Sequence, residues 1–291
     1  MIDWVFLDVG NILLDEDPLT YLVFRRHVEA VQRVRPDRSF ADLLAEREAR
    51  ASAGSAWPVY ETVSAYLDSD ACADVWATVE REVEERYAEL SPLIPGAAEL
   101  VDWLAARFGL GLIANQGRAC RERLADLGLL ARFEVVAFSE EESIAKPDPG
   151  LFQRAIERAG AEPSRCLMVG DRLDNDLEPA ARLGMATAWV LWPRREAKGW
   201  QPGDPEAMAY VRSLDRSARC REDLWRRVQP TVTVAELNEL AEALALRTGE
   251  GLLSPLDRAD QAPYHESPRS VPDLMQPDPR RNRTARQGDR G

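Results

Sequence analysis

The chain has 291 residues, of which 45% are hydrophobic and 30% charged, a composition typical of a globular protein with a sizeable buried core. Its formal net charge of −13 argues against a nucleic-acid partner, because phosphate backbones are bound through basic surfaces. No apolar run is long enough to span a membrane and no signal peptide is visible, so we expect a cytoplasmic protein without a membrane partner.

The first expected element is a short buried strand, Trp4 to Val9, which ends in a turn. In residues 16–92 the apolar side chains recur only at helical spacing, which predicts a separate all-helical unit. Residues 93–250 alternate short apolar runs with helical patterns, and with residues 1–15 they form the main predicted domain. This alternation indicates an α/β fold, a Rossmann-like parallel sheet with helices on both faces.

Two segments do not follow this alternation of strands and helices. Residues 193–229 read as a long charged insertion in the α/β domain, with at least one helix of its own. Residues 251–291 are rich in Pro, Arg, Asp and Ser without periodicity, so we expect a disordered tail. At the start of the insertion, Trp192 and Trp200 flank Lys198, which suggests a surface patch for a partner or a second copy of the chain.

Polar residues follow several of the predicted strands, where parallel sheets bind their ligands. Asp8 ends the first strand, Lys146 precedes a helix, and Asp171 and Asp176 follow a later strand. A carboxylate can attack phosphorus, and Mg²⁺ prefers a few carboxylates together with water and substrate oxygens. Only two of the 37 basic residues are lysines, and one of them is Lys146. The three segments read Phe6-Leu7-Asp8-Val9-Gly10-Asn11, Lys146-Pro147-Asp148-Pro149 and Gly170-Asp171-Arg172-Leu173-Asp174-Asn175-Asp176.

Each of these residues also has a structural explanation. Asp8 can shape a turn, Asp174 or Asp176 can cap the next helix, and Lys146 can lie on the surface beside a turn proline. Taken singly, each structural explanation is the better one. Their joint occurrence, in this order and at strand ends, favours a functional site.

The order and spacing of the three segments resemble motifs I, III and IV of the haloacid dehalogenase (HAD) superfamily. Residues 110–116 stand where motif II of that family is expected, and the resemblance covers about residues 1–247. The helical unit 16–92 falls where the family inserts a C1-type helical cap. The resemblance therefore implies a HAD-like α/β core with an inserted all-α cap.

The resemblance also implies a role for each motif residue. Asp8 is the expected nucleophile, and Lys146 is expected to hold both the nucleophile and the phosphoryl group. A Mg²⁺ ion is implied as the cofactor, and the residues implied at or around it are Asp8, the carbonyl of Gly10, Asp171 and, in the outer shell, Asp176. The implied phosphate-binding residues are Ala114, Asn115 and Gln116.

Two positions depart from the family pattern. Gly10 stands where the family usually has a second Asp that protonates the leaving group, and Ala114 replaces a Ser or Thr. Loss of a general acid–base typically costs about 10²–10⁴-fold in rate, and loss of a hydrogen bond to a charged group costs about 1.5–3 kcal/mol. We therefore expect Gly10→Asp to raise activity on alkyl phosphates more than on aryl phosphates.

Three functions remain open at this point. The first is a Mg²⁺-dependent phosphatase that acts on a small phosphorylated metabolite through an aspartyl-phosphate on Asp8. Its substrate would have a leaving group that needs little protonation, or the acid would come from the cap or from the substrate. The second is a catalytically weakened domain that binds a ligand or a protein, and the third is a 2-haloacid dehalogenase. We rank the phosphatase ahead of the binding domain, because neither departure removes the nucleophile, the metal ligands or the lysine. The dehalogenase comes last, because an acidic metal site would be idle in it. The substrate stays open, as does the choice between monomer and homodimer.

Overall fold

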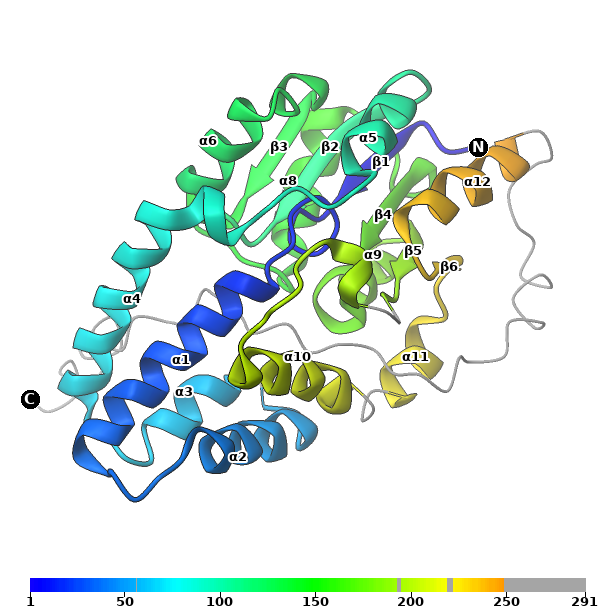
Figure 1. Cartoon of the computed structure of the whole chain (residues 1–291). Coiled ribbons are helices and arrows are strands. Elements are labelled where there is room, and N and C mark those ends of the chain that lie inside the picture. The colour runs from blue at the N-terminus through cyan, green and yellow to red at the C-terminus, as the bar shows by residue number, and fades with distance from the viewer. Residues whose placement is uncertain (56, 193–194, 219–221, 249–291) are drawn as a thin grey trace, which may run out of the picture.

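The structure, a computed structural model, describes residues 1–55, 57–192, 195–218 and 222–248; the predicted tail 251–291 lies outside the described residues. Its centre is a six-stranded sheet in the order β3-β2-β1-β4-β5-β6, in which every neighbouring pair is parallel (Figure 1). This confirms the predicted α/β fold. The strands are β1 (Trp4–Leu7), β2 (Gly109–Ala114), β3 (Val135–Phe138), β4 (Cys166–Gly170), β5 (Ala186–Val190) and β6 (Val232–Val234).

Helices cover both faces of the sheet because the strands are apolar on both sides. Along β1, Val5 and Leu7 belong to one core cluster and Phe6 belongs to another, as expected when side chains alternate between the faces. The helices that cover the first face are α5 (Ala97–Ala105), α6 (Arg118–Asp126) and α12 (Leu237–Thr248). Those that cover the second face are α8 (Pro149–Ala159), α9 (Glu178–Arg182) and α11 (Glu222–Val228). The short α7 (Ser139–Glu142) follows β3.

A layer of helices lies beyond one end of the strands (Figure 1). We call it the helical layer; it consists of α1 (Asp17–Val34), α2 (Phe40–Ser52), α3 (Pro58–Val63), α4 (Ser69–Leu90) and α10 (Pro205–Ala218). The helix predicted inside the insertion 193–229 is α10, and it packs on α1 and α2. Tyr210 of α10 stacks on Phe24 with ring centroids 5.4 Å apart, and Phe24 in turn contacts Phe40. The layer is therefore built from two distant parts of the chain: α1–α4, which follow β1, and α10, which follows β5.

The segment between β5 and α10 does not form the predicted surface patch. Trp192 and Lys198 are buried, with exposed fractions of 2% and 0%. The indole of Trp192 donates to the carbonyl oxygen of Asn11 at 2.7 Å, and the Lys198 ammonium lies 2.9 Å from Asp15 and 2.7 Å from Asp17. The prediction was wrong because these side chains bind the loop after β1 and the start of α1 instead of facing solvent.

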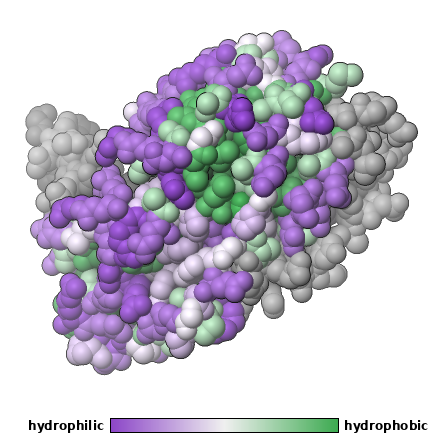
Figure 2. Space-filling view, turned by 45° about the horizontal axis from the view of Figure 1, so that its top comes forward, coloured by the Kyte–Doolittle hydropathy of each residue, from purple (hydrophilic) through white to green (hydrophobic). Residues whose placement is uncertain are grey.

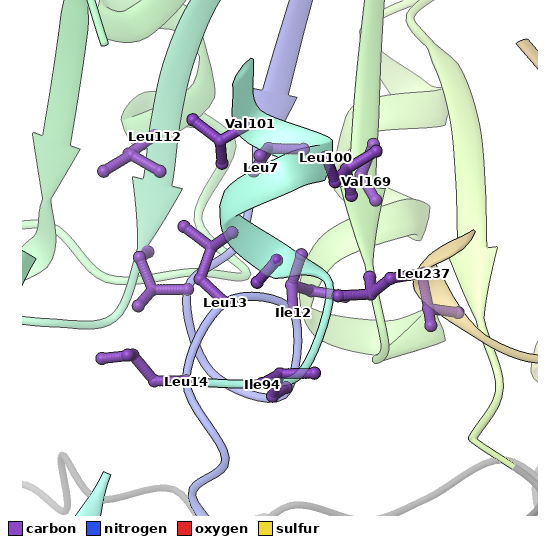
Figure 3. Close-up of a cluster of buried hydrophobic side chains, with 14 of the residues drawn as sticks. Leu7, Ile12, Leu13, Leu14, Ile94, Leu100, Val101, Leu112, Val169 and Leu237 are labelled. Atoms are coloured by element: carbon purple, nitrogen blue, oxygen red, sulfur yellow. The ribbon is translucent and has the colours of Figure 1, made fainter. Parts of the chain in front are cut away.

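The loop after β1 is a tight turn held by backbone and side chains together. The carbonyl oxygen of Val9 accepts hydrogen bonds from the amides of Ile12, Leu13 and Leu14. The three aliphatic side chains point into the core cluster around Leu7 (Figure 3). Leu14 then pairs with Leu93 in an isolated bridge, at the point where the chain enters and leaves α1–α4. The turn that carries Asp8 is thus anchored in the core.

The surface fits the charged composition. Hydrophilic residues cover most of the face shown in Figure 2, with hydrophobic residues gathered in one central area. Among the described residues, the large hydrophobic side chains classed as exposed are Met1, Val34 and Met208. Within the same part of the chain, no helix combines the length and the apolar character needed to cross a bilayer.

Candidate active site

The two central strands bring the first polar residues together. β1 and β4 are neighbours in the sheet, and the strand order reverses between them, which is where open parallel sheets bind ligands. Leu7 is in register with Val169, and the Asp8 amide donates to the Val169 carbonyl oxygen at 2.9 Å. Asp8 and Asp171 therefore leave neighbouring strand ends on the same edge of the sheet.

Three carboxylates and one ammonium group meet at this edge. One carboxylate oxygen each from Asp8, Asp171 and Asp176 lies within 4.8 Å of the other two, and all three residues are buried. The Lys146 ammonium lies 2.8 Å from Asp8 Oδ1 and 2.7 Å from Asp176 Oδ1, with its side chain 1% exposed. We call these four residues the carboxylate–lysine cluster.

Local structure fixes the positions of Asp176 and Lys146. Asp176 lies in the single wide helical turn Leu173–Leu177, and its Oδ2 accepts the Arg172 amide at 3.0 Å. Gly170 leaves room for this carboxylate, which a methyl group at Gly170 would overlap. The Asn115 side chain holds the backbone of Lys146 through two hydrogen bonds: its Oδ1 accepts the Lys146 amide at 2.7 Å, and its Nδ2 donates to the Lys146 carbonyl oxygen at 3.0 Å.

Burial and charge shift the pKa values of the cluster in opposite ways. Burial, together with the negative charges of Asp176 and Asp171, outweighs the attraction of Lys146 and raises the pKa of Asp8 to about 7. Burial alone would lower the pKa of Lys146, but the charges of Asp176 and Asp8 outweigh it and raise that pKa. The Lys146 ammonium therefore stays charged. A further positive charge nearby would favour the ionised form of Asp8.

The cluster has the chemistry of a divalent-cation site. One ammonium can balance only one of three carboxylates, so ionising all of them in this buried space is costly without a further cation. Carboxylate oxygens are the ligands that Mg²⁺ prefers in proteins. Asp176 is already engaged by Lys146 and the Arg172 amide, which suits it to orient ligands around an ion more than to contact it directly.

The other predicted site residues lie in the turn after β1 and at or just after the end of β2. Ala114 ends β2 and is fully buried, and Gly10 lies two residues after Asp8 in the tight turn. The Asn115 side chain bonds to Lys146, as described above, and not toward open space. The Gln116 amide accepts the Tyr87 hydroxyl at 3.0 Å and donates to Glu16. The amides of the expected phosphate-binding segment thus hold neighbouring side chains in this structure.

Sequence reasoning missed Glu16. It is 4% exposed, and its carboxylate lies against Gly10. Burial and the charge of Asp8 raise the pKa of Glu16 to about 8, more than the hydrogen bond from Gln116 lowers it. The run Asp15-Glu16-Asp17, directly after an apolar loop, is a signal that could have marked this position.

A cavity of about 140 Å³ opens beside Gln116, between the helical layer and α6. Its walls are mostly apolar, with acidic side chains and one arginine among its lining residues. The apolar lining side chains contributed by α1 and α4 include Leu19, Val23, Trp76, Val79 and Val83.

Residues 2–184 match the protein family described as haloacid dehalogenase-like hydrolase. The chain belongs to this family. This HAD-like hydrolase is 32% identical over 159 residues to the pyrimidine 5′-nucleotidase YjjG of Escherichia coli, a match that covers 54% of the chain and 59% of the relative. It is 38% identical over 126 residues to a phosphoserine phosphatase of Thermus thermophilus, covering 43% and 48%. The chain spans about half the length of these curated relatives.

Among solved structures, the HAD-hydrolase YfnB of Bacillus subtilis, bound to magnesium, has a TM-score of 0.57 to the HAD-like chain. The two are 21% identical, and the match covers 84% of this chain and 98% of YfnB. At this identity the likeness shows a common fold. The resemblance inferred from the sequence motifs is thereby confirmed at the level of family and fold.

Proposed function

We propose that the protein is a Mg²⁺-dependent phosphatase that hydrolyses small phosphate monoesters through an aspartyl-phosphate on Asp8. The observation that carries this proposal is the carboxylate–lysine cluster, which unites a nucleophile, a fixed positive charge and cation ligands at one strand edge. Its relatives by sequence are named as phosphatases and a nucleotidase, which act on phosphate esters.

Each residue of the cluster has a distinct task in this reaction. Asp8 attacks phosphorus, so that its oxygen replaces the ester oxygen of the substrate. Lys146 holds Asp8 in position and attracts an equatorial oxygen of the transferring group. Asp8, the Gly10 carbonyl and Asp171 would hold Mg²⁺, with Asp176 orienting the ligands around it. When bound, the ion neutralises the charge that builds up on the phosphoryl oxygens.

The helical layer supplies the surroundings of the leaving group. α1 and α4 line the cavity beside Gln116 with aliphatic and aromatic side chains. If the helical layer closes over a bound substrate, such a largely apolar space would exclude water and strengthen the interactions inside it. We therefore propose that the helical layer acts as a cap, and that it selects esters whose alcohol portion carries apolar groups.

The test is hydrolysis of p-nitrophenyl phosphate and of a panel of metabolite phosphates by the full chain, with and without Mg²⁺. We expect turnover only with Mg²⁺, and an Asp8→Asn variant that folds normally should lose activity, because its amide is a far weaker nucleophile. Metal-independent release of halide from a 2-haloacid would instead establish a dehalogenase. Binding of phosphate esters without turnover of any of them would establish a ligand-binding domain.

A further inference from the structure

An alkyl phosphate releases an alkoxide unless a proton reaches the departing oxygen, and Gly10 has no side chain that could deliver one. Two carboxylates of the carboxylate–lysine cluster are bound to Lys146, and Asp171 completes the set suited to a cation. In the described part of the chain, Glu16 is a further buried carboxylate that faces the turn after β1. It lies outside the cation-binding set.

Glu16 fills the space that the missing side chain of Gly10 leaves open. A Cβ atom built on Gly10 would lie 2.5 Å from Oε2 of Glu16 and 2.9 Å from Oε1. The carboxylate thus stands where a side chain at position 10 would project, two residues from the nucleophile. The tight turn through Ile12, Leu13 and Leu14 brings the chain back to this point, and its apolar anchors hold it there (Figure 3).

Neither helix capping nor pairing with Lys198 explains the position of the Glu16 side chain. Glu16 is the residue before α1, yet its side chain makes no capping hydrogen bond. Its two acidic neighbours, Asp15 and Asp17, pair with Lys198, whereas Glu16 accepts a hydrogen bond from the Gln116 amide at Oε1. Tyr87 donates to the Gln116 carbonyl oxygen at 3.0 Å, which fixes the amide with its NH₂ group toward Glu16. Oε1 thus accepts the Gln116 hydrogen bond, and Oε2 is the oxygen nearer to the Cβ position of Gly10.

We infer that Glu16 is the general acid and base of the reaction, an inference that rests on the proposed phosphatase function. In the first step the bond from Asp8 to phosphorus forms, the ester P–O bond breaks, and Glu16 passes its proton to the departing alcohol oxygen. In the second step Glu16 takes a proton from water while the water oxygen bonds to phosphorus. The bond to Asp8 breaks, inorganic phosphate leaves, and both side chains return to their starting states.

The decisive variant is Glu16→Gln, which keeps the size of the side chain and its place beside Gln116. On alkyl phosphates we expect a loss of kcat of about 10²–10⁴-fold. On p-nitrophenyl phosphate, whose leaving group needs no proton, the first step should survive and the second should slow. Rapid mixing should then show a burst of p-nitrophenol equal to the enzyme present, and intact-mass measurement should show the phosphorylated protein. Glu29→Gln, at a partly exposed glutamate of α1 that pairs with Arg25 and Arg26, is the control and should behave like wild type.

A double variant that moves the carboxylate from position 16 to position 10 distinguishes a catalytic role of Glu16 from a structural one. Gly10→Asp alone, which the sequence suggested would raise activity, meets the Glu16 carboxylate and should not. In Glu16→Ala the space is open, so Gly10→Asp/Glu16→Ala should recover alkyl phosphate turnover lost in Glu16→Ala. Equal losses of Glu16→Gln on alkyl and aryl esters without a burst, or no recovery in the double variant, overturn the role of Glu16 and leave the phosphatase intact. Failure of wild type to turn over any ester, or activity in Asp8→Asn, overturns the proposed function and this inference with it.

Discussion

Lys146 and Lys198, the two lysines of the chain, are both buried between carboxylates. Lys146 joins Asp8 to Asp176, and Lys198 joins Asp15 to Asp17. A compact ammonium suits such positions, because it carries its charge as a point and makes bonds in several directions. The same residue type thus serves the proposed reaction in one place and the joint between two parts of the fold in the other.

Lys146→Met tests the first of these positions. Without the ammonium, a phosphoryl group at Asp8 loses a fixed donor, and we expect kcat to fall by about 10²–10³-fold with saturating Mg²⁺. Lys146→Arg should lose nearly as much, since the planar guanidinium does not fit a site shaped for an ammonium. Steady-state kinetics on p-nitrophenyl phosphate measures both, with the surface variant Arg35→Ala as a control of unchanged rate. An active Lys146→Met enzyme would contradict the role given to this residue.

At the residue scale, strand ends were readable from the sequence and turns were not. Asp8, Asp171 and Asp176 follow apolar runs, so the parallel sheet that those runs predict already gathers them at one edge. Glu16 reaches Gly10 only because the loop between them doubles back, and nothing in the pattern of residues fixes that path. The bond between Asn115 and the Lys146 backbone was equally hidden, because it joins residues 31 positions apart.

At the scale of elements, the segment after β5 joins the α/β part to the helical layer. Lys198 packs against the start of α1, the Trp200 amide donates to Asp15 at 3.2 Å, and α10 completes the aromatic cluster of α1 and α2. Strands and helices were predictable from apolar periodicity. The partner of α10 was not, since an amphipathic helix shows which face it buries without showing what covers that face.

Lys198→Met should destabilise the protein strongly. It leaves Asp15 and Asp17 buried without their counter-charge, which costs about 3–5 kcal/mol when a buried pair is broken. Adding Asp15→Asn and Asp17→Asn to Lys198→Met should recover part of that loss. The free energy of unfolding from urea titration decides, with Arg132→Ala as the matched control. Its partner Asp102 is exposed like Arg132, so that change should stay within about 0.5 kcal/mol. A similar loss of unfolding free energy in Lys198→Met and Arg132→Ala would contradict this account of Lys198.

At the scale of the whole molecule, charge sets a condition for binding an anion. The chain carries a formal net charge of −13, which repels a phosphate ester approaching from solvent. The buried cluster adds three carboxylates at the point where the proposed substrate would bind. A bound divalent cation would reverse the local potential there, so the proposed cofactor is also what makes the site attractive to its substrate.

Mg²⁺ should therefore stabilise the folded protein even without substrate. At a concentration about 100 times its dissociation constant, a ligand that binds only the folded state adds about 2.7 kcal/mol, which corresponds to a rise in Tm of about 5–10 °C for a chain of this size. Differential scanning calorimetry measures the rise, with NaCl at equal ionic strength to account for screening. Asp171→Asn should abolish it, and an undiminished rise in that variant would place the ion elsewhere.

The split origin of the helical layer has a consequence for the growing polypeptide. α1–α4 are synthesised first, but the helix that covers Phe24 and Phe40 begins about 115 residues after α4 ends. During that interval the aromatic face lacks its native cover, and exposed apolar surface of this kind promotes association between incomplete chains. The four early helices can gain their full stability only after α10 has emerged from the ribosome, so residues 17–90 reach their final packing late although they are made early.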